Sequence, residues 1–302
     1  MAPTTTLLTV HAHPDDETIS TGGVMARYSR AGHRVICVTC TGGEHGEIVV
    51  PELDTPENHA NLRDIRAEEL RHALELLGPI ESRKLGYLDS GMMGTSQNEE
   101  AGSVWTADLD EAAGRLVRIV RETRPQVIVG YNDFGGYGHP DHIRAAQIAK
   151  LAFARAGDPS WYPEQLADGL EPWQPLKLYE TVMDLSRRME LFELMKERGI
   201  RSWITGVEDE TPEQKAQREA HLQRMADATG PKTTSVDVSE MIDAKLAALR
   251  AHVTQIAADN FFLVFTPDEW RRYQPTEDFT LRVSRVGVEI PESDLFAGLP
   301  GA

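Results

Sequence analysis

The sequence contains few cysteines, a minority of basic residues and no long apolar run. Its two cysteines, Cys37 and Cys40, stand three positions apart on one predicted strand and so face opposite sides of it. This spacing argues against a disulfide and favours buried free thiols. Lysine and arginine total 31 against 48 aspartates and glutamates, which gives a net charge of −17. Such a surface repels phosphate backbones and anionic membranes, so we expect neither nucleic acid nor membrane as a partner.

The first residues and the length of the apolar runs indicate where in the cell the protein is expected. No stretch reaches the roughly eighteen uncharged apolar residues that a membrane helix needs. Residues 1–6 lack the basic and apolar parts of a signal peptide, so we expect a cytoplasmic protein. Nothing in the sequence sets the oligomeric state, and an oligomer is compatible with it.

The order of predicted elements indicates an α/β fold. Up to residue 157, β-rich apolar runs alternate with segments of helical period; the strands are expected at 7–10, 34–41, 84–88 and 126–131 and the helices at 20–31, 61–77, 109–122 and 143–156. This order predicts a Rossmann-like, mainly parallel sheet with helices on both faces over residues 1–157. Residues 158–302 are expected to form a smaller C-terminal α/β portion that packs on this core as part of one unit and completes the active-site rim. It begins with a surface excursion at 158–175 and continues with strands at 176–184 and 235–238, a helix at 241–256 that bears His252, and an edge strand at 278–286.

Two polar clusters follow two of the predicted strands. Residues 11–17 read His-Ala-His-Pro-Asp-Asp-Glu after an apolar run, and residues 138–142 read Gly-His-Pro-Asp-His after another. Ligands of open α/β sheets bind where strands end in such loops. His13 and Asp16 are the natural metal pair of the first cluster, and His142 of the second supplies a third ligand, which leaves a position for water at a catalytic zinc. The alternative is that these residues only cap the helices that follow.

The remaining polar residues of the clusters suit amide hydrolysis. Asp15 cannot easily bind the same ion as its neighbour and is better placed as the general base, although it could also be a helix N-cap. Tyr137 and His139 can supply a hydroxyl and an imidazolium to the oxyanion and the leaving amine, unless Tyr137 is a packed loop aromatic. Asp141 could be the partner of His139 behind the metal ligands, and either of the two could serve only to orient the His142 ring.

The paired motifs at residues 12–17 and 139–142 resemble those of the LmbE-like or PIG-L-type zinc-dependent N-acetylglucosaminyl deacetylases. The resemblance implies zinc, with ferrous iron possible in the same site. It implies the same ligands, His13, Asp16 and His142, with Asp15 as base and with Tyr137 and His139 at the oxyanion and leaving group. It also implies that the enzyme hydrolyses the N-acetyl amide of a small-molecule glucosamine conjugate.

Over its whole length the sequence resembles the mycothiol branch of that family. The shared segments include residues 42–47, 89–91, 135–138 and the Ala-His-Val-Thr-Gln run at 251–255. By this resemblance Glu47, Arg66, Asp89 and Asn260 would bind sugar hydroxyls, although each has a plain reading as a solvated or paired polar group. The branch contains a deacetylase of N-acetylglucosamine-inositol and a mycothiol S-conjugate amidase. The lack of a lysine near Ser20 favours the deacetylase, while the second half looks more like the amidase.

Two other classes of protein remain alternatives. Non-haem iron oxygenases also use two histidines and one carboxylate, but they build them on a jelly roll, which the strand-helix order argues against. A non-catalytic sugar-binding protein could use a metal to brace its loops. The spare acid Asp15 speaks against it, because purely structural zinc sites are closed by four protein ligands.

Overall fold

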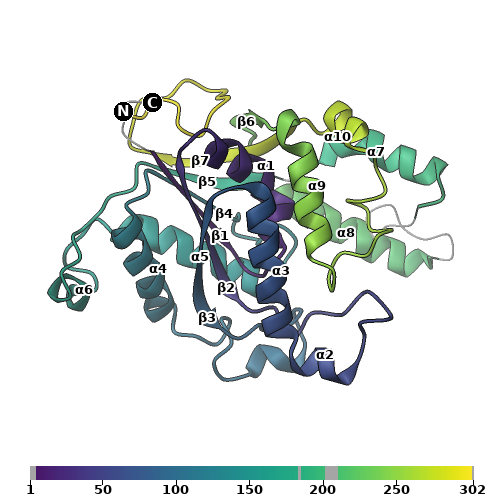
Figure 1. Cartoon of the computed structure of the whole chain (residues 1–302), viewed down its shortest axis with the longest axis horizontal. Helices are drawn as coiled ribbons and strands as arrows, with labels where there is room; N and C mark the ends of the chain where they lie inside the picture. Colours follow the sequence, from purple (N-terminus) through teal and green to yellow (C-terminus); the bar gives the residue numbers. More distant parts are fainter. Residues whose placement is uncertain (1–4, 183–184, 201–209, 301–302) are drawn as a thin grey trace.

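The computed structural model describes residues 5–182, 185–200 and 210–300. Its centre is one sheet with the strand order β3-β2-β1-β4-β5-β7-β6 (Figure 1). The five strands from β3 to β5 run parallel, and β7 is antiparallel to both of its neighbours. The strands are, in chain order, β1 (Thr6–His11), β2 (Arg34–Thr41), β3 (Ile80–Tyr87), β4 (Val127–Gly130), β5 (Lys177–Val182), β6 (Thr234–Asp237) and β7 (Thr276–Ser284).

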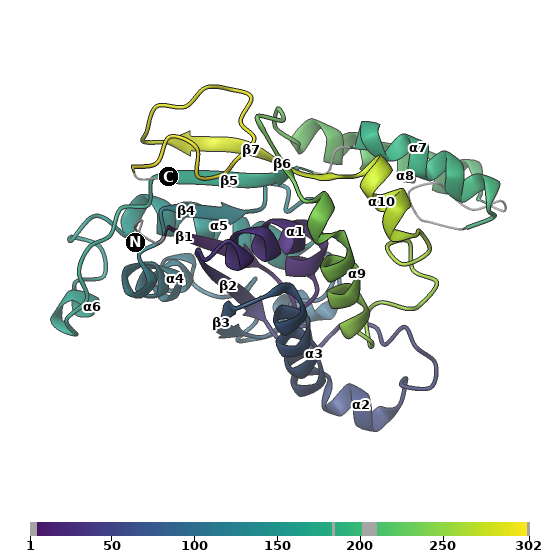
Figure 2. The same cartoon turned by 45° about the horizontal axis from the view of Figure 1, so that its top comes forward.

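Helices cover both faces of the sheet (Figures 1 and 2). On one face lie α1 (Asp16–Arg30), α3 (Leu62–Leu77) and α9 (Ile242–Ala251), and on the other α4 (Leu109–Thr123) and α5 (Pro140–Arg155). The remaining helices are α2 (Pro56–Ala60), α6 (Pro163–Ala167), α7 (Leu185–Glu197), α8 (Pro212–Ala228) and α10 (Pro267–Tyr273), with short 3-10 turns η1 at Ser96–Glu99 and η2 at Ser239–Met241. The mainly parallel α/β architecture expected from the sequence is confirmed.

The buried strands explain why the core has two halves. Every residue of β1 is buried, as in strands covered on both faces, and its side chains alternate between the two core clusters. Cys37 and Cys40 of β2 are free, buried and divided between these clusters, as their spacing predicts. β1 pairs in parallel with both β2 and β4. The carboxyl ends of β1 and β4 therefore lie side by side, which places the two polar clusters together.

The second half of the chain extends the same sheet. β5 continues the parallel order, and β7 and β6 complete it. Behind these strands, Nζ of Lys177 lies 2.5 Å from Oε1 of Glu292, and the hydroxyls of Tyr179 and Thr234 donate to Oε2 of the same carboxylate. Lys177 and Glu292 are almost fully buried. This cluster binds the segment around Glu292 to β5 and β6.

Several boundaries differ from the sequence prediction. β3 begins at Ile80 rather than at residue 84, and α5 begins at Pro140 rather than at residue 143. The first helix begins at Asp16, inside the polar cluster, rather than at residue 20. α9 ends at Ala251, and His252 follows it as the C-cap instead of lying within the helix. β7 is not an edge strand, because β6 pairs with its first four residues. β6 stops at Asp237, so residues 281–284 of β7 have only β5 beside them and are half-buried or exposed.

None of the helices in the described residues is long and apolar enough to span a membrane. The excursion at 158–175 contains the short helix α6. It is held by the buried guanidinium of Arg121, which donates to four backbone carbonyls between residues 156 and 162.

Candidate metal and catalytic site

The two polar clusters meet at the carboxyl ends of β1 and β4. Residues 12–15 join β1 to α1, and residues 131–139 join β4 to α5. Asp16 begins α1, and His142 lies in the first turn of α5. Positive φ angles at Gly135, Gly136 and Gly138 fold the second loop back over the helix start.

The Asp16 carboxylate lies between two imidazoles. Its Oδ2 is 3.3 Å from Nδ1 of His13 and 3.2 Å from Nε2 of His142. The same oxygen accepts a hydrogen bond from the backbone N–H of His13. Nε2 of His142 is buried and makes no hydrogen bond within the described part of the chain. A buried imidazole nitrogen aimed at a carboxylate in this way suits a divalent cation.

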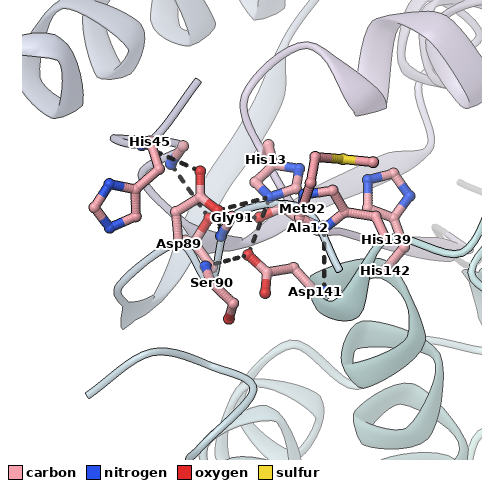
Figure 3. Close-up of polar contacts among 12 residues, drawn as sticks. Ala12, His13, His45, Asp89, Ser90, Gly91, Met92, His139, Asp141 and His142 are labelled. Atoms are coloured by element: carbon pink, nitrogen blue, oxygen red, sulfur yellow. Dashed lines mark hydrogen bonds and ion pairs between the residues drawn. The ribbon is translucent and has the colours of Figure 1, made fainter. Parts of the chain in front are cut away.

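Carboxylates hold the opposite edge of the His13 ring (Figure 3). Nε2 of His13 lies 3.1 Å from Oδ2 of Asp141 and 3.7 Å from Oδ1 of Asp89. Asp141 also accepts from the backbone N–H of Ser90. Burial opposes protonation of His13, but the hydrogen bonds to Asp141 and Asp16 outweigh it and raise the pKa of His13. Asp141 thus contacts His13 and not His142, which corrects the orientation expected from the sequence.

Asp15 stands beside the cluster in a strained backbone conformation. Its φ is 112°, which non-glycine residues rarely adopt. Its N–H donates to Oε2 of Glu17 at 2.8 Å, and its Oδ2 accepts from Nη2 of Arg66 at 3.2 Å. Burial raises the pKa of Asp15 to about 6, against the opposing charge of Arg66. Its side chain makes no helix-cap hydrogen bond, so the N-cap alternative fails in that respect.

Tyr137 and His139 lie over the same centre. The Tyr137 ring packs edge-on against His142, with the centroids 4.8 Å apart, and burial raises its pKa. His139 is the N-cap of α5, and its Nδ1 accepts the backbone N–H of Asp141. The proton of a neutral ring is therefore on Nε2. Burial and the charges of His13 and His142 lower the pKa of His139 to about 3, which favours the neutral ring over the imidazolium expected from the sequence.

Known proteins are similar to this chain in sequence. The model of the PIG-L family, described as GlcNAc-PI de-N-acetylase, matches residues 8–153. The 1D-myo-inositol 2-acetamido-2-deoxy-alpha-D-glucopyranoside deacetylase of Streptomyces scabiei is 40% identical over 301 residues, 98% of this chain and 90% of the relative. Deacetylase 2 of the same name from Frankia alni is 42% identical over 305 residues, 96% of this chain and 99% of the relative. The chain belongs to the PIG-L family.

Solved structures with different activities share the fold of this chain at low sequence identity. The N,N'-diacetylchitobiose deacetylase of Pyrococcus horikoshii superposes with a TM-score of 0.62 at 21% identity, over 91% of this chain and 83% of that one. The 4-carboxy-2-hydroxymuconate hydratase of Pseudomonas putida KT2440 gives 0.61 at 19% identity, over 94% and 99%. Because a deacetylase and a hydratase share the architecture, the fold alone does not define the reaction.

The four residues that the PIG-L resemblance assigns to the sugar have different surroundings. Glu47 is exposed in the loop after β2, and Asp89 is buried beside His13. Arg66 is buried, and its Nη1 and Nη2 donate to the carbonyls of Gly43 and Pro14. The Asn260 side chain accepts from the backbone N–H of Phe262 within its own turn. Asp89 and Arg66 thus border the site through protein contacts, while Asn260 is engaged locally.

The sequence analysis did not assign three buried groups that support this PIG-L site. Glu17 and His252 are both fully buried, with Oε1 and Nε2 3.0 Å apart. The hydroxyl of Tyr131 accepts from the Ala12 N–H and contacts the Asp16 carboxylate. Glu17 lies inside the first motif and His252 inside the run at 251–255, so both stretches were noticed. Their pairing depends on tertiary structure, which neither stretch encodes locally.

A cavity of about 140 Å³ opens beside the cluster of Asp16 and His142. Its lining combines polar residues of the cluster with apolar residues of the C-terminal portion: Asp16, Tyr137, His142, Leu246, Leu249, Phe262 and Trp270. It also includes Thr181 of β5. Asp89 follows β3 and Glu47 follows β2, so these two lie toward the other side of β1 in the sheet order. The cluster therefore stands between a polar side and a largely apolar side.

Proposed function

We propose that this protein hydrolyses the N-acetyl amide of an N-acetylglucosamine conjugate such as N-acetylglucosamine-inositol, using a zinc ion, and releases acetate and the free amine. The observation that carries the proposal is the position of Asp16, whose Oδ2 lies within 3.3 Å of ring nitrogens of both His13 and His142 with Asp15 beside it. The substrate is suggested by the names of relatives that are about 40% identical over nearly the whole chain.

We assign the ion to His13, Asp16 and His142. Two other groupings, His13 with His139 and His142 and His13 with Asp89 and Asp141, bring three donor atoms within 4.8 Å of one another. In the assigned set, Oδ2 of Asp16 instead lies between the two imidazoles, at 3.3 and 3.2 Å. We prefer the set of His13, Asp16 and His142. Nδ1 of His139 already accepts a hydrogen bond from the backbone of Asp141, and Oδ2 of Asp141 already accepts one from the backbone of Ser90. Two imidazoles and one carboxylate are a common catalytic zinc set, and ferrous iron would fit the same donors. The bound ion would polarise the amide carbonyl and acidify water.

The protein's own groups would perform the proton transfers. Asp15 accepts the proton of the attacking water, and Arg66 holds its carboxylate in place. The hydroxyl of Tyr137 and the Nε2–H of His139 donate to the oxyanion that develops when the water oxygen bonds to the carbonyl carbon. The C–N bond then breaks, and the proton held by Asp15 passes to the departing amine. Glu47, Asp89, Arg66 and Asn260 are the proposed contacts of the sugar.

A side-by-side assay tests this function. Zinc-loaded protein is offered N-acetylglucosamine-inositol, N-acetylglucosamine and a mycothiol S-conjugate, and the released amine is measured. The highest kcat/KM is expected for N-acetylglucosamine-inositol. Stripping the metal should abolish turnover, and zinc should restore it without oxygen. A strict requirement for iron, oxygen and a co-substrate would instead identify an oxygenase, and metal binding without any hydrolysis would indicate a binding protein.

The apolar cavity favours a second candidate, an amidase that removes acyl groups larger than acetyl, as in a mycothiol S-conjugate amidase. With the sugar on the polar side of the cluster, the acyl group would point toward Leu246 and Trp270. An acetyl methyl fills only a small part of about 140 Å³. We expect a hexanoyl amide of glucosamine-inositol to be hydrolysed by the wild type and not by Leu246→Trp, which should retain the acetyl activity. A wild type that rejects hexanoyl excludes this candidate.

A further inference from the structure

The segment that follows α9 contacts three separate parts of the site. This post-α9 segment, residues 252–255, belongs to the C-terminal portion of the chain. His252 pairs with Glu17 at the start of α1, with Nε2 3.0 Å from Oε1. Thr254 donates from its backbone N–H and its hydroxyl to the two oxygens of Glu69 on α3, both at 2.8 Å. Gln255 donates to the carbonyl of Glu47 in the loop after β2.

The contact with Glu17 reaches Asp15 in one further step. Oε1 of Glu17 faces His252 and the Thr18 hydroxyl, while Oε2 accepts the backbone N–H of Asp15 at 2.8 Å. Glu17 and His252 are both 0% exposed. A buried carboxylate held on both oxygens has little freedom to turn, because every alternative position leaves a charged group without a partner.

The contact with Glu69 reaches Asp15 by a second path. Arg66 and Glu69 are three residues apart on α3, and both are buried. Residues at this spacing lie on the same face of a helix. Arg66 donates to Oδ2 of Asp15 and to the carbonyl of Pro14, at 3.2 and 2.5 Å. Through Glu69, Thr254 thus holds the turn of α3 that carries Arg66. The Arg66 guanidinium in turn orients the Asp15 side chain.

Asp15 requires such support because its own backbone opposes the observed conformation. A φ of 112° is unfavourable for a residue with a Cβ and persists only where neighbouring contacts compensate for it. The N–H of Asp15 is bound by Glu17, and its carboxylate is bound by Arg66. Glu17 is bound directly by His252, and Arg66 lies one turn before Glu69, which Thr254 binds.

We propose that the post-α9 segment is a positioning device for the general base, with His252 a positioning residue that acts through Glu17. The inference rests on the proposed function, since it assumes that Asp15 removes the proton from water. His252 touches neither the substrate nor the ligand set. Its loss should therefore lower kcat while the KM and the bound zinc stay close to wild type.

The test compares His252→Leu with His252→Gln on the full-length, zinc-loaded protein. Leucine removes the hydrogen bond to Glu17, whereas the glutamine amide can donate one. We expect His252→Leu to lower kcat by about 10- to 100-fold, the scale of an ångström-sized misplacement of a reacting group. His252→Gln should recover most of it. Both should keep one zinc per chain and a KM within about twofold of wild type.

A control separates positioning from general loss of stability. Phe265 is buried in the same C-terminal portion and lies outside the cavity and the network, so Phe265→Leu should lower the unfolding temperature and leave kcat unchanged. If His252→Leu does not fold, Thr254→Val, which removes one of the two bonds to Glu69, should lower kcat in the same direction. A wild-type kcat in either variant, or equal damage from His252→Gln and His252→Leu, overturns the proposal.

A structural readout distinguishes failure of this inference from failure of the proposed function. If the wild type hydrolyses no amide, the proposed function fails, and the crystal structure of His252→Leu then decides the inference alone. Relaxation of Asp15 to a negative φ supports the positioning role. A φ that remains near 112° rejects it.

Discussion

Nε2 of His13 and Oδ2 of Asp141 lie 3.1 Å apart although 128 positions separate them in the sequence. This contact leaves Nδ1 of His13 facing Asp16. In metal sites, a carboxylate in this position fixes the tautomer and the orientation of the ligating ring. The Asp141 carboxylate therefore links the loop after β1 to the first turn of α5. It also holds the His13 ring in the orientation in which Nδ1 could bind an ion.

Asp141→Asn should weaken zinc binding by about 10- to 100-fold, because the amide holds the His13 ring less firmly. A competition titration with a chromophoric chelator measures the affinity. Asp133→Asn is the matched control, since Asp133 lies in the same loop region but is exposed and pairs with Lys150. Equal affinity of the Asp141 variant and the wild type would show that Asp141 does not support the ligand.

Asp15→Asn should reduce kcat by about 10²- to 10⁴-fold, the range for loss of a general base. The substitution preserves shape, so the zinc content and the unfolding temperature should remain near wild type. Released amine and metal stoichiometry are measured on the same sample. Loss of the metal would mean that Asp15 is a ligand, and the division of roles between Asp15 and Asp16 would be wrong.

Gly43→Ala should impair catalysis through Arg66. Gly43 has a φ of 67°, and a Cβ added there would come within 2.2 Å of Nη1 of Arg66. The guanidinium must move, and Asp15 loses its partner, so kcat should fall by at least tenfold. Gly94→Ala is the control, because Gly94 has a similar positive φ of 89° and nothing within 4 Å. Both variants should lose about 1–2 kcal/mol of stability, but only the first should lose activity.

Lys177→Met should destabilise the fold by about 3–5 kcal/mol, because it leaves the Glu292 carboxylate buried without its cation. Urea unfolding followed by circular dichroism measures this loss. The double variant with Glu292→Gln should recover part of the stability, since no buried charge remains. A double variant less stable than Lys177→Met would contradict this explanation.

The local pattern was sufficient for the core of the fold and for the meeting of the two motifs. β2 runs from Arg34 to Thr41 as predicted, because a dense β-branched run bounded by Gly32 and Gly42 has few alternatives. The repeated His-Pro-Asp pattern after two strands indicated that His13 and His142 would meet, and parallel pairing of β1 with β4 brings them together. The ligand set itself and the base remain predictions until a metal is bound.

Other features depend on contacts that the sequence does not encode locally. α1 begins at Asp16 because Asp15 adopts a positive φ under constraint from Glu17 and Arg66, whose contacts with Asp15 no local pattern shows. His252 lies just after the end of α9 and contacts Glu17, which is 235 positions away in the sequence. β7 lies between β5 and β6 because β6 pairs with it. The strand at 235–238 was predicted, but its four-residue pattern does not show which strand it pairs with.

The neighbouring positions of β1 and β4 also set the order of events during synthesis. The ribosome releases β1, the loop with His13 and the start of α1 with Asp16 well before β4 and the helix that carries His142. On the proposed ligand set, a nascent chain therefore has only two donors and retains an ion weakly. Tight capture waits until the central strands have joined, so a truncated or nicked chain would give up its metal, and metal content would report on completion of the sheet.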